Sequence, residues 1–279
     1  PSTVSTVDRI DYSNDTATAS PKGPLSVARY GLAATSSQAN AITAGTLFPA
    51  STARDNIFPQ GFDTGYFGGG YVTGNTPTSK VDRIDYSNDT ATASAKGPLS
   101  SANSYLAATG NASFGYFGGG YYPAPKTTVD RIDYSNDTGT APAKGPLSVA
   151  KVRLAATGNV SFGYFAGGFP NTSTVDRIDY SNDTATASPK GPLSLARAYL
   201  AATGNQDFGY TGGGHDGGVT SKVQRIDYSN DTATAVAKGP LSVARYGITA
   251  TGNSSFGYFG GGTPGEKSTV DRIDYSNDT

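Results

Sequence analysis

One octapeptide, Arg-Ile-Asp-Tyr-Ser-Asn-Asp-Thr, occurs six times in the 279 residues of this chain. The copies begin at Arg9, Arg83, Arg131, Arg177, Arg225 and Arg272. The last four spacings are 46 to 48 residues, and the first, 74 residues, contains an extra segment. Self-similarity at a fixed period indicates a repeat architecture, and a unit of about 47 residues matches a four-stranded propeller blade. The sequence therefore predicts an all-β propeller.

Each repeat divides into four short runs of β-forming residues separated by turn residues. In the last full copy these runs are residues 246–251, residues 256–259 before a triple glycine, and residues 268–275. The Ser-Asn-Asp-Thr turn leads into a fourth run, such as residues 91–94, which ends at a Gly-Pro pair. Proline cannot donate to a strand ladder, so this run suits an outer edge. We expect antiparallel four-stranded blades.

The order of these features resembles the kelch family of propellers. The resemblance rests on a Gly-Gly pair after an aromatic strand, as at residues 116–119, followed by a variable loop and a hydrophobic strand that ends in Tyr, as at residues 129–134. It covers the whole chain except the extra segment. The tryptophan usual in the fourth kelch strand is replaced here by Thr or Ala, as at Thr92 and Ala93.

Counting inner strands predicts five blades in a single domain over residues 1–279. The candidates are residues 30–35, 105–109, 153–157, 199–203 and 246–251. The third run occurs six times, so one copy is surplus in a closed ring. Residues 16–25 can supply the outer strand that would follow Thr279, which would leave residues 1–15 as a spare arm. The alternative is a ring of six or more blades, with the chain as part of a larger array. The insertion, near residues 36–64, is predicted between strands one and two of the first blade.

Charge and composition exclude several classes of partner and site. Lys and Arg number 21 against 22 Asp and Glu, so no basic surplus points to nucleic acid. The absence of cysteine excludes disulfides, thiolate metal sites and a cysteine nucleophile, and leaves the compartment open. No apolar stretch approaches the roughly 18 residues needed to span a bilayer. An extracellular or virion-surface location is favoured.

Three motifs that suggest chemistry have simpler structural interpretations. The triple glycine at residues 68–70 is followed by neither Lys-Ser/Thr nor a helix, so we expect it to allow close blade packing rather than phosphate binding. The string at residues 85–90 lacks the ligand alternation of a calcium loop and suits side chains that cap their own turn. Its Asn-Asp-Thr triplet is also a glycosylation acceptor, as are the triplets at Asn111, Asn159, Asn171 and Asn253. His215 is the only histidine, so we expect no metal site, no cofactor and no catalytic residue.

Arg and Asp in the octapeptide, such as Arg131 and Asp133, lie two apart and therefore share a strand face. A blade face is largely covered by its neighbour. Ion pairs between neighbouring blades, or hydrogen bonds to loop carbonyls, are therefore the expected use of these charges.

The repeat copies differ mainly in the loop after the triple glycine and in the segment before the inner strand. Blade topology places both on one face of the disc, around the channel mouth. Aromatic, basic and amide side chains there form the set favoured at recognition surfaces. The predicted ligand-binding residues are Tyr30, Tyr71, Asn103, Tyr105, Tyr121, Tyr122, Lys151, Arg153, Phe169, Arg197, Tyr199, His215, Arg245 and Tyr246.

These observations predict a non-catalytic binding module that recognises a protein or a glycan. The first alternative is a structural repeat of a larger extracellular or virion assembly, which self-associates through a spare terminal strand. The second alternative is a propeller enzyme, which would need clustered carboxylates at the channel mouth. The chain contains a single glutamate, Glu266.

Overall fold

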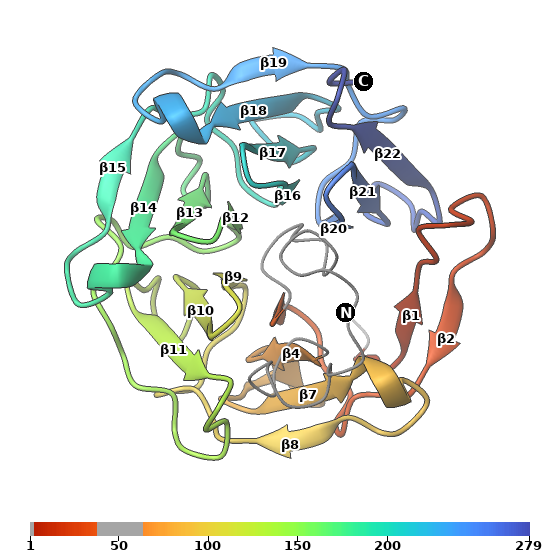
Figure 1. Cartoon of the computed structure of the whole chain (residues 1–279), viewed down its shortest axis with the longest axis vertical. Coiled ribbons are helices and arrows are strands. Elements are labelled where there is room, and N and C mark those ends of the chain that lie inside the picture. The colour runs from red at the N-terminus through yellow and green to blue at the C-terminus, as the bar shows by residue number, and fades with distance from the viewer. Residues whose placement is uncertain (1–2, 38–63) are drawn as a thin grey trace, which may run out of the picture.

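The computed structural model describes residues 3–37 and 64–279, and nearly all of its regular structure is β-strand. Five small antiparallel sheets stand around a central axis as the blades of a five-bladed propeller (Figure 1). The strands of each blade pair in chain order from the centre to the edge. The predicted fold class and the five predicted blades are confirmed.

Equivalent strands of the five blades carry equivalent parts of the repeat. The innermost strands contain the Ala-Thr pair and are β3 (Ala33–Ser36), β9 (Ala107–Gly110), β12 (Ala155–Gly158), β16 (Ala201–Gly204) and β20 (Thr249–Gly252). The second strands are rich in aromatic residues and glycine and are β4 (Thr64–Gly68), β10 (Phe114–Gly118), β13 (Phe162–Ala166), β17 (Phe208–Gly212) and β21 (Phe256–Gly260).

The outer halves of the blades contain the octapeptide and the run that follows it. The third strands are β7 (Val81–Asp85), β11 (Val129–Asp133), β14 (Val175–Asp179), β18 (Val223–Asp227) and β22 (Val270–Asp274). The outer strands are β8 (Ser94–Lys96), β15 (Ser188–Lys190) and β19 (Val236–Lys238). In the second blade the outer segment joins β11 through a bridge between Asp130 and Ala143. A small hairpin, β5 (Tyr71–Val72) with β6 (Thr76–Pro77), lies in the loop after β4.

The inner strands begin two or three residues later than predicted. Two residues before each strand the backbone has a positive φ, at Gly31, Tyr105, Arg153, Tyr199 and Gly247. A left-handed residue cannot continue an extended ladder, so each chain turns here before its strand starts. The predicted starts at residues 30, 105, 153, 199 and 246 are therefore wrong.

The turn after each third strand is held by its own side chains, as predicted. Asp85 accepts hydrogen bonds from the Ser87 backbone amide at 2.9 Å and from the Ser87 hydroxyl at 2.6 Å. Short 3-10 helices follow three of the third strands, η1 (Tyr86–Asn88), η2 (Tyr180–Asn182) and η3 (Tyr228–Asn230). The repeated Asp of the third strand is thus a turn cap.

The repeated Arg of the third strand crosses to the next blade, and this confirms the predicted ion pairs between blades. Arg131 donates to Asp183 at 2.7 Å, and Asp183 lies in the turn of the third blade. Asp133, which shares the strand with Arg131, instead accepts from Ser135. Arg131 therefore connects two blades, whereas Asp133 stabilises the turn of its own blade.

Glycines in the second strands allow neighbouring blades to approach closely. A Cβ at Gly118 would lie 2.6 Å from the ring of Phe165 in the next blade. Tyr116 stacks on Tyr180 across the same junction, with ring centroids 4.8 Å apart, and both side chains are buried. Each of the four junctions between consecutive blades contains such a cluster, so the apolar core is divided among the spaces between blades.

The N-terminal segment does not complete the last blade in the way predicted. β2 (Ser20–Lys22) pairs with β1 (Val7–Arg9), and among the described residues β22 pairs only with β21. The prediction that residues 16–25 supply an outer strand to the last blade is therefore wrong. Residues 3–15 are not a spare arm either, since Asp15 contacts the last blade and Val4 forms a bridge with Arg29. The hairpin lies between the last blade and the first (Figure 1).

The insertion joins strands one and two of the first blade, because β3 and β4 form an antiparallel pair on either side of it. The Ser37 amide donates to the Thr64 carbonyl at 3.0 Å where the pair ends. The predicted segment, near residues 36–64, otherwise lies outside the described residues.

Candidate functional site

The two variable segments of the repeat meet on one face of the propeller. In each blade the segment before the inner strand forms a β-bridge with the loop that follows the glycines after the second strand. The bridges are Tyr30 with Tyr71, Ser104 with Tyr121, Val152 with Phe169, Ala198 with His215 and Tyr246 with Thr263. The segments before the inner strands and the loops that these bridges join to them define what we call the variable face.

A row of four backbone hydrogen bonds connects the segments of the variable face from one blade to the next. The amides of Tyr105, Arg153, Tyr199 and Gly247 each donate to the carbonyl of the equivalent residue one blade earlier, at 2.6 to 2.9 Å. Three of these four positions carry a large side chain despite a φ of 53° to 60°. Strained backbone of this kind costs on the order of 1–3 kcal/mol and is concentrated at functional sites.

Four of the predicted binding residues are buried and serve the fold. Asn103, Lys151, Arg197 and Arg245 occupy the same repeat position and are at most 3% exposed. Their side chains donate to backbone carbonyls of the adjoining loop, as Arg245 does to Gly261 and Thr269. These four side chains are not available to a ligand on the variable face, which corrects their selection as contact residues.

Carboxylates on the third strands form ion pairs with two of these four buried side chains. Lys151 lies 3.0 Å from Asp176, and Arg245 also pairs with Asp271. Burial lowers the pKa of Lys151, and the charge of Asp176 opposes that effect. Arg197 faces Gln224 instead of a carboxylate, and burial lowers the pKa of Arg197 to about 10.

The remaining predicted residues bring aromatic rings together on the variable face. Tyr30 stacks on Tyr71 with ring centroids 5.1 Å apart, and Tyr105 meets the edge of Tyr71 at 5.6 Å. The Arg153 guanidinium lies 4.6 Å from the ring centre of Tyr105 and 4.5 Å from that of Tyr199. The cation is thus held between two rings, an arrangement that stabilises it and fixes both side chains.

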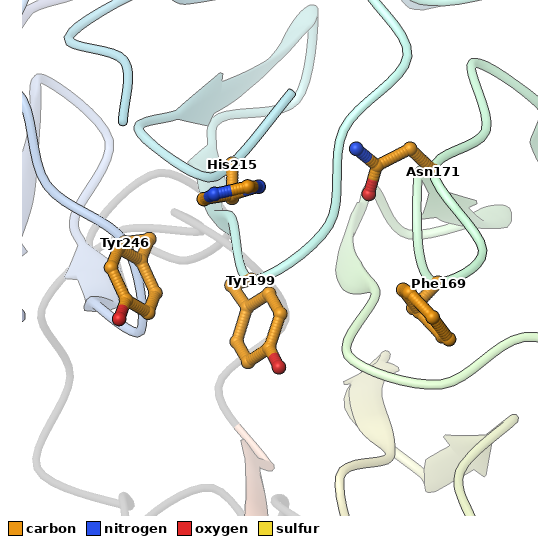
Figure 2. Close-up of a pocket in the computed structure, with 5 residues that line it drawn as sticks. All are labelled: Phe169, Asn171, Tyr199, His215 and Tyr246. Carbon is orange, nitrogen blue, oxygen red and sulfur yellow. The ribbon is translucent and has the colours of Figure 1, made fainter. Parts of the chain in front are cut away.

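A depression of about 500 Å³ opens on this face over the third, fourth and fifth blades. It is lined by Phe169, Asn171, Tyr199, His215 and Tyr246 (Figure 2). Tyr246 meets the edge of Tyr199 at 5.4 Å and of His215 at 5.8 Å. Phe169 is 48% exposed, so its ring is open to a ligand. The volume falls in the range of small-molecule sites.

Four of the five lining residues belong to the predicted set, and Asn171 was missed. Asn171 lies two residues after Phe169 in the same variable loop and faces the opening (Figure 2). Its amide adds a donor and an acceptor to a lining that is otherwise mostly aromatic. A polar side chain in a loop that differs between copies is the signal that identifies it. Tyr121 and Tyr122 are exposed on the loop of the second blade and do not line the depression.

Neither a membrane-spanning helix nor a candidate metal cluster is found in the described ranges. Within residues 3–37 and 64–279 no helix is long and apolar enough to cross a bilayer. In the same ranges no three His, Asp or Glu side chains are grouped closely enough to hold a metal ion. No protein-family model matches the chain, and no curated protein matches it significantly.

Proposed function

We propose that this chain is a kelch-like propeller that acts as a non-catalytic binding module and recognises a glycan at the depression on its variable face. The observation that carries the proposal is the lining itself, with three aromatic rings beside one amide and one imidazole. A sugar ring offers an apolar face that packs on aromatic rings and hydroxyl groups that pair with amide and imidazole nitrogens. None of the five described lining residues is an Asp, Glu, Lys or Arg, which favours a neutral ligand.

The kelch-like assignment is supported by the order of features within each blade. In four of five blades the second strand ends in the first glycine of a Gly-Gly pair, as β10 does at Gly118 before Gly119. A variable loop and a third strand beginning with Val come next. In the fold, Gly118 and Gly119 lie where the next blade approaches closely, since a Cβ there would meet Phe165 at 2.6 Å and the Lys151 carbonyl oxygen at 2.7 Å.

The non-catalytic assignment rests on the chemistry of the lining. Glycoside hydrolysis commonly requires two carboxyl groups beside the scissile bond. Among residues 3–37 and 64–279, no Asp or Glu lines the depression. The proposal therefore expects a glycan to be bound and released unchanged.

A glycan array and a peptide array, probed with the full chain, test the proposal. We expect saturable binding to glycans that is reduced at least tenfold when Phe169, Tyr199 and Tyr246 are replaced together by Ala, because aromatic anchors supply most of the affinity at such sites. Val160→Ala is the matched control, since Val160 is 45% exposed and lies in the loop between β12 and β13, away from the variable face. Binding to peptides alone, or equal loss with Val160→Ala, would contradict the proposal.

A further inference from the structure

The junctions between consecutive blades are built from one set of contacts. A Tyr of the second strand and the Arg of the third strand both reach one Asp in the turn of the next blade. The sets are Tyr66 and Arg83 on Asp137, Tyr116 and Arg131 on Asp183, Tyr164 and Arg177 on Asp231, and Tyr210 and Arg225 on Asp278. This set therefore identifies a blade-to-blade junction.

The N-terminal hairpin makes the same contacts with the fifth blade. Tyr258 and Arg272 each donate to Asp15 at 2.8 Å. Tyr12 stacks on Tyr258 at 5.3 Å and forms a hydrogen bond with Thr251 at 2.9 Å. The hairpin thus meets the fifth blade as the outer half of a further blade would.

The other side of the hairpin meets the first blade in the same way. Arg9 lies 2.8 Å from Asp89, and Lys22 lies 3.3 Å from the same carboxylate. Lys96 and Arg83 contact Asp137 in the corresponding arrangement one junction later. β1 and β2 therefore occupy the third and fourth strand positions between the fifth blade and the first.

The inner half of this position has no partner among the described residues. A Cβ at Gly68, Gly118 or Gly212 would meet a Phe ring of the next blade at 2.6 to 2.7 Å. At Gly260, the equivalent glycine of the fifth blade, the nearest atom is Val270 Cγ2 at 3.6 Å. Val270 is 47% exposed, whereas the equivalent Val129 is fully buried.

The tyrosine that follows the third strand is unusually exposed both in the N-terminal hairpin and in the first blade, on either side of this position. Tyr134, at an interior junction, is 6% exposed. The equivalent Tyr12 and Tyr86 are 38% and 45% exposed. Both tyrosines flank the position at which an inner pair of strands would lie.

The size of the last residue of each second strand varies with the size of the side chain that faces it from the next blade. In the third blade Ala166 replaces the glycine, and the repeat position of the facing Phe is Thr211 in the fourth blade. The larger Ala166 side chain is thus faced by Thr211, which is smaller than Phe. Gly260 is a glycine, as are the equivalent residues Gly68, Gly118 and Gly212 that face a Phe ring.

We propose that this position binds a β-hairpin with the inner-strand sequence of the same repeat, donated by another molecule that carries the repeat, and that the hairpin pairs with β1 to complete a sixth blade. Strand addition of this kind obtains affinity from main-chain hydrogen bonds and specificity from side-chain pockets. One continuous segment suffices, because residues 139–174 run from an outer strand position to an inner hairpin between the second and third blades. The same segment would cover β22 and then reach β1.

The test is a titration of the full chain with a labelled synthetic peptide of residues 139–174, followed by fluorescence anisotropy. We expect saturable binding at one peptide per chain. The matched control peptide carries Gly163→Val, because a Cβ at Gly163 lies 2.6 Å from a Thr of the preceding blade and 2.7 Å from its own blade's Tyr hydroxyl. Valine favours strands, so weaker binding of this peptide cannot come from lower strand propensity.

A substitution in the chain that receives the peptide tests the space beside Gly260. Gly260→Val fills the space beside Val270 without meeting another blade, so the variant should melt as the parent chain does and bind the peptide at least tenfold more weakly. Absence of binding by the full chain, or equal binding of both peptides, overturns the proposal. Binding that requires removal of residues 38–63 also overturns it, since the chain itself would then occupy the position.

Discussion

The loss of stability on substituting a glycine of this propeller depends on which atoms of the next blade lie against that glycine. Gly119 and Gly261 occupy the same repeat position, with φ of 69° and 71°. A Cβ at Gly119 would lie 2.7 Å from the Lys151 carbonyl oxygen, whereas a Cβ at Gly261 would lie 3.9 Å from its nearest neighbour. The two positions share backbone strain and differ in packing.

Gly119→Ala should therefore lower the free energy of unfolding by more than about 2 kcal/mol, the sum of left-handed strain and overpacking. Gly261→Ala should cost about 1 kcal/mol, from the strain alone. Urea denaturation of both variants measures the difference. Equal losses would show that the close approach at Gly119 does not contribute.

Asn103 is the residue where the repeat departs most from its own electrostatic pattern. In the first, third and fifth blades a buried Arg or Lys pairs with the carboxylate of the third strand. In the second blade Asn103 takes the place of that cation. Burial raises the pKa of Asp130, and hydrogen bonds from Ser100 and the charge of Lys126 only partly oppose it.

Asn103→Arg should raise the free energy of unfolding at pH 7 by about 1 kcal/mol, because it supplies the missing cation. The pKa of Asp130 is raised in the folded state, so the parent chain gains stability as pH falls through that raised pKa. The advantage of the variant should shrink over the same range, because the carboxyl becomes neutral. Chemical denaturation at several pH values checks this. A variant that is less stable at pH 7 would contradict the pairing.

At the scale of strands, the sequence predicted the elements better than their first residues. The runs of β-branched, aromatic and small residues identified the first three strands of every blade, whereas the outer run predicted at residues 91–94 is found at β8 (Ser94–Lys96). The inner strand starts were wrong because Tyr105, Arg153 and Tyr199 are left-handed, and such side chains do not mark that conformation. Gly31 and Gly247, at the same repeat position, carried the only local signal for it. The N-terminal hairpin was misplaced because strand pairing between distant segments depends on contacts such as Asp15 with Arg272.

The blade junctions predict a cooperative loss of structure in alkali. Burial raises the pKa of Tyr66 to about 12 and raises the pKa values of Tyr116 and Tyr164 further. A tyrosine whose pKa is raised in the folded state contributes stability fully below its ordinary value of 10, and this contribution is lost as pH rises toward the folded value. The junction tyrosines should therefore ionise together with loss of the circular dichroism of the strands.

Ultraviolet absorbance of tyrosinate, recorded beside circular dichroism across that pH range, is the measurement. The chain contains 18 tyrosines, and the junction members should appear as a late, steep step. Smooth ionisation of all tyrosines with unchanged circular dichroism would contradict the burial of the junctions.

At the scale of the whole molecule, differences between repeat copies predicted which segments gather on one face. Blade topology brings the two variable segments together, and the observed bridges follow that topology. The sequence did not show which long side chains turn inward. Lys151, Arg197 and Arg245 look like surface residues until the loop carbonyls and third-strand carboxylates around them are placed. That environment is created by folding.

The proposed binding of a ligand at the depression on the variable face can be measured directly because the chain contains no tryptophan. Phe169→Trp places a single fluorescent reporter in the depression, and Val160→Trp places one in the loop between β12 and β13. Titration with a glycan selected on the array should change the emission of the Phe169→Trp reporter saturably and leave the Val160→Trp reporter unchanged. A response from the Val160→Trp reporter with none from Phe169→Trp would contradict this proposal.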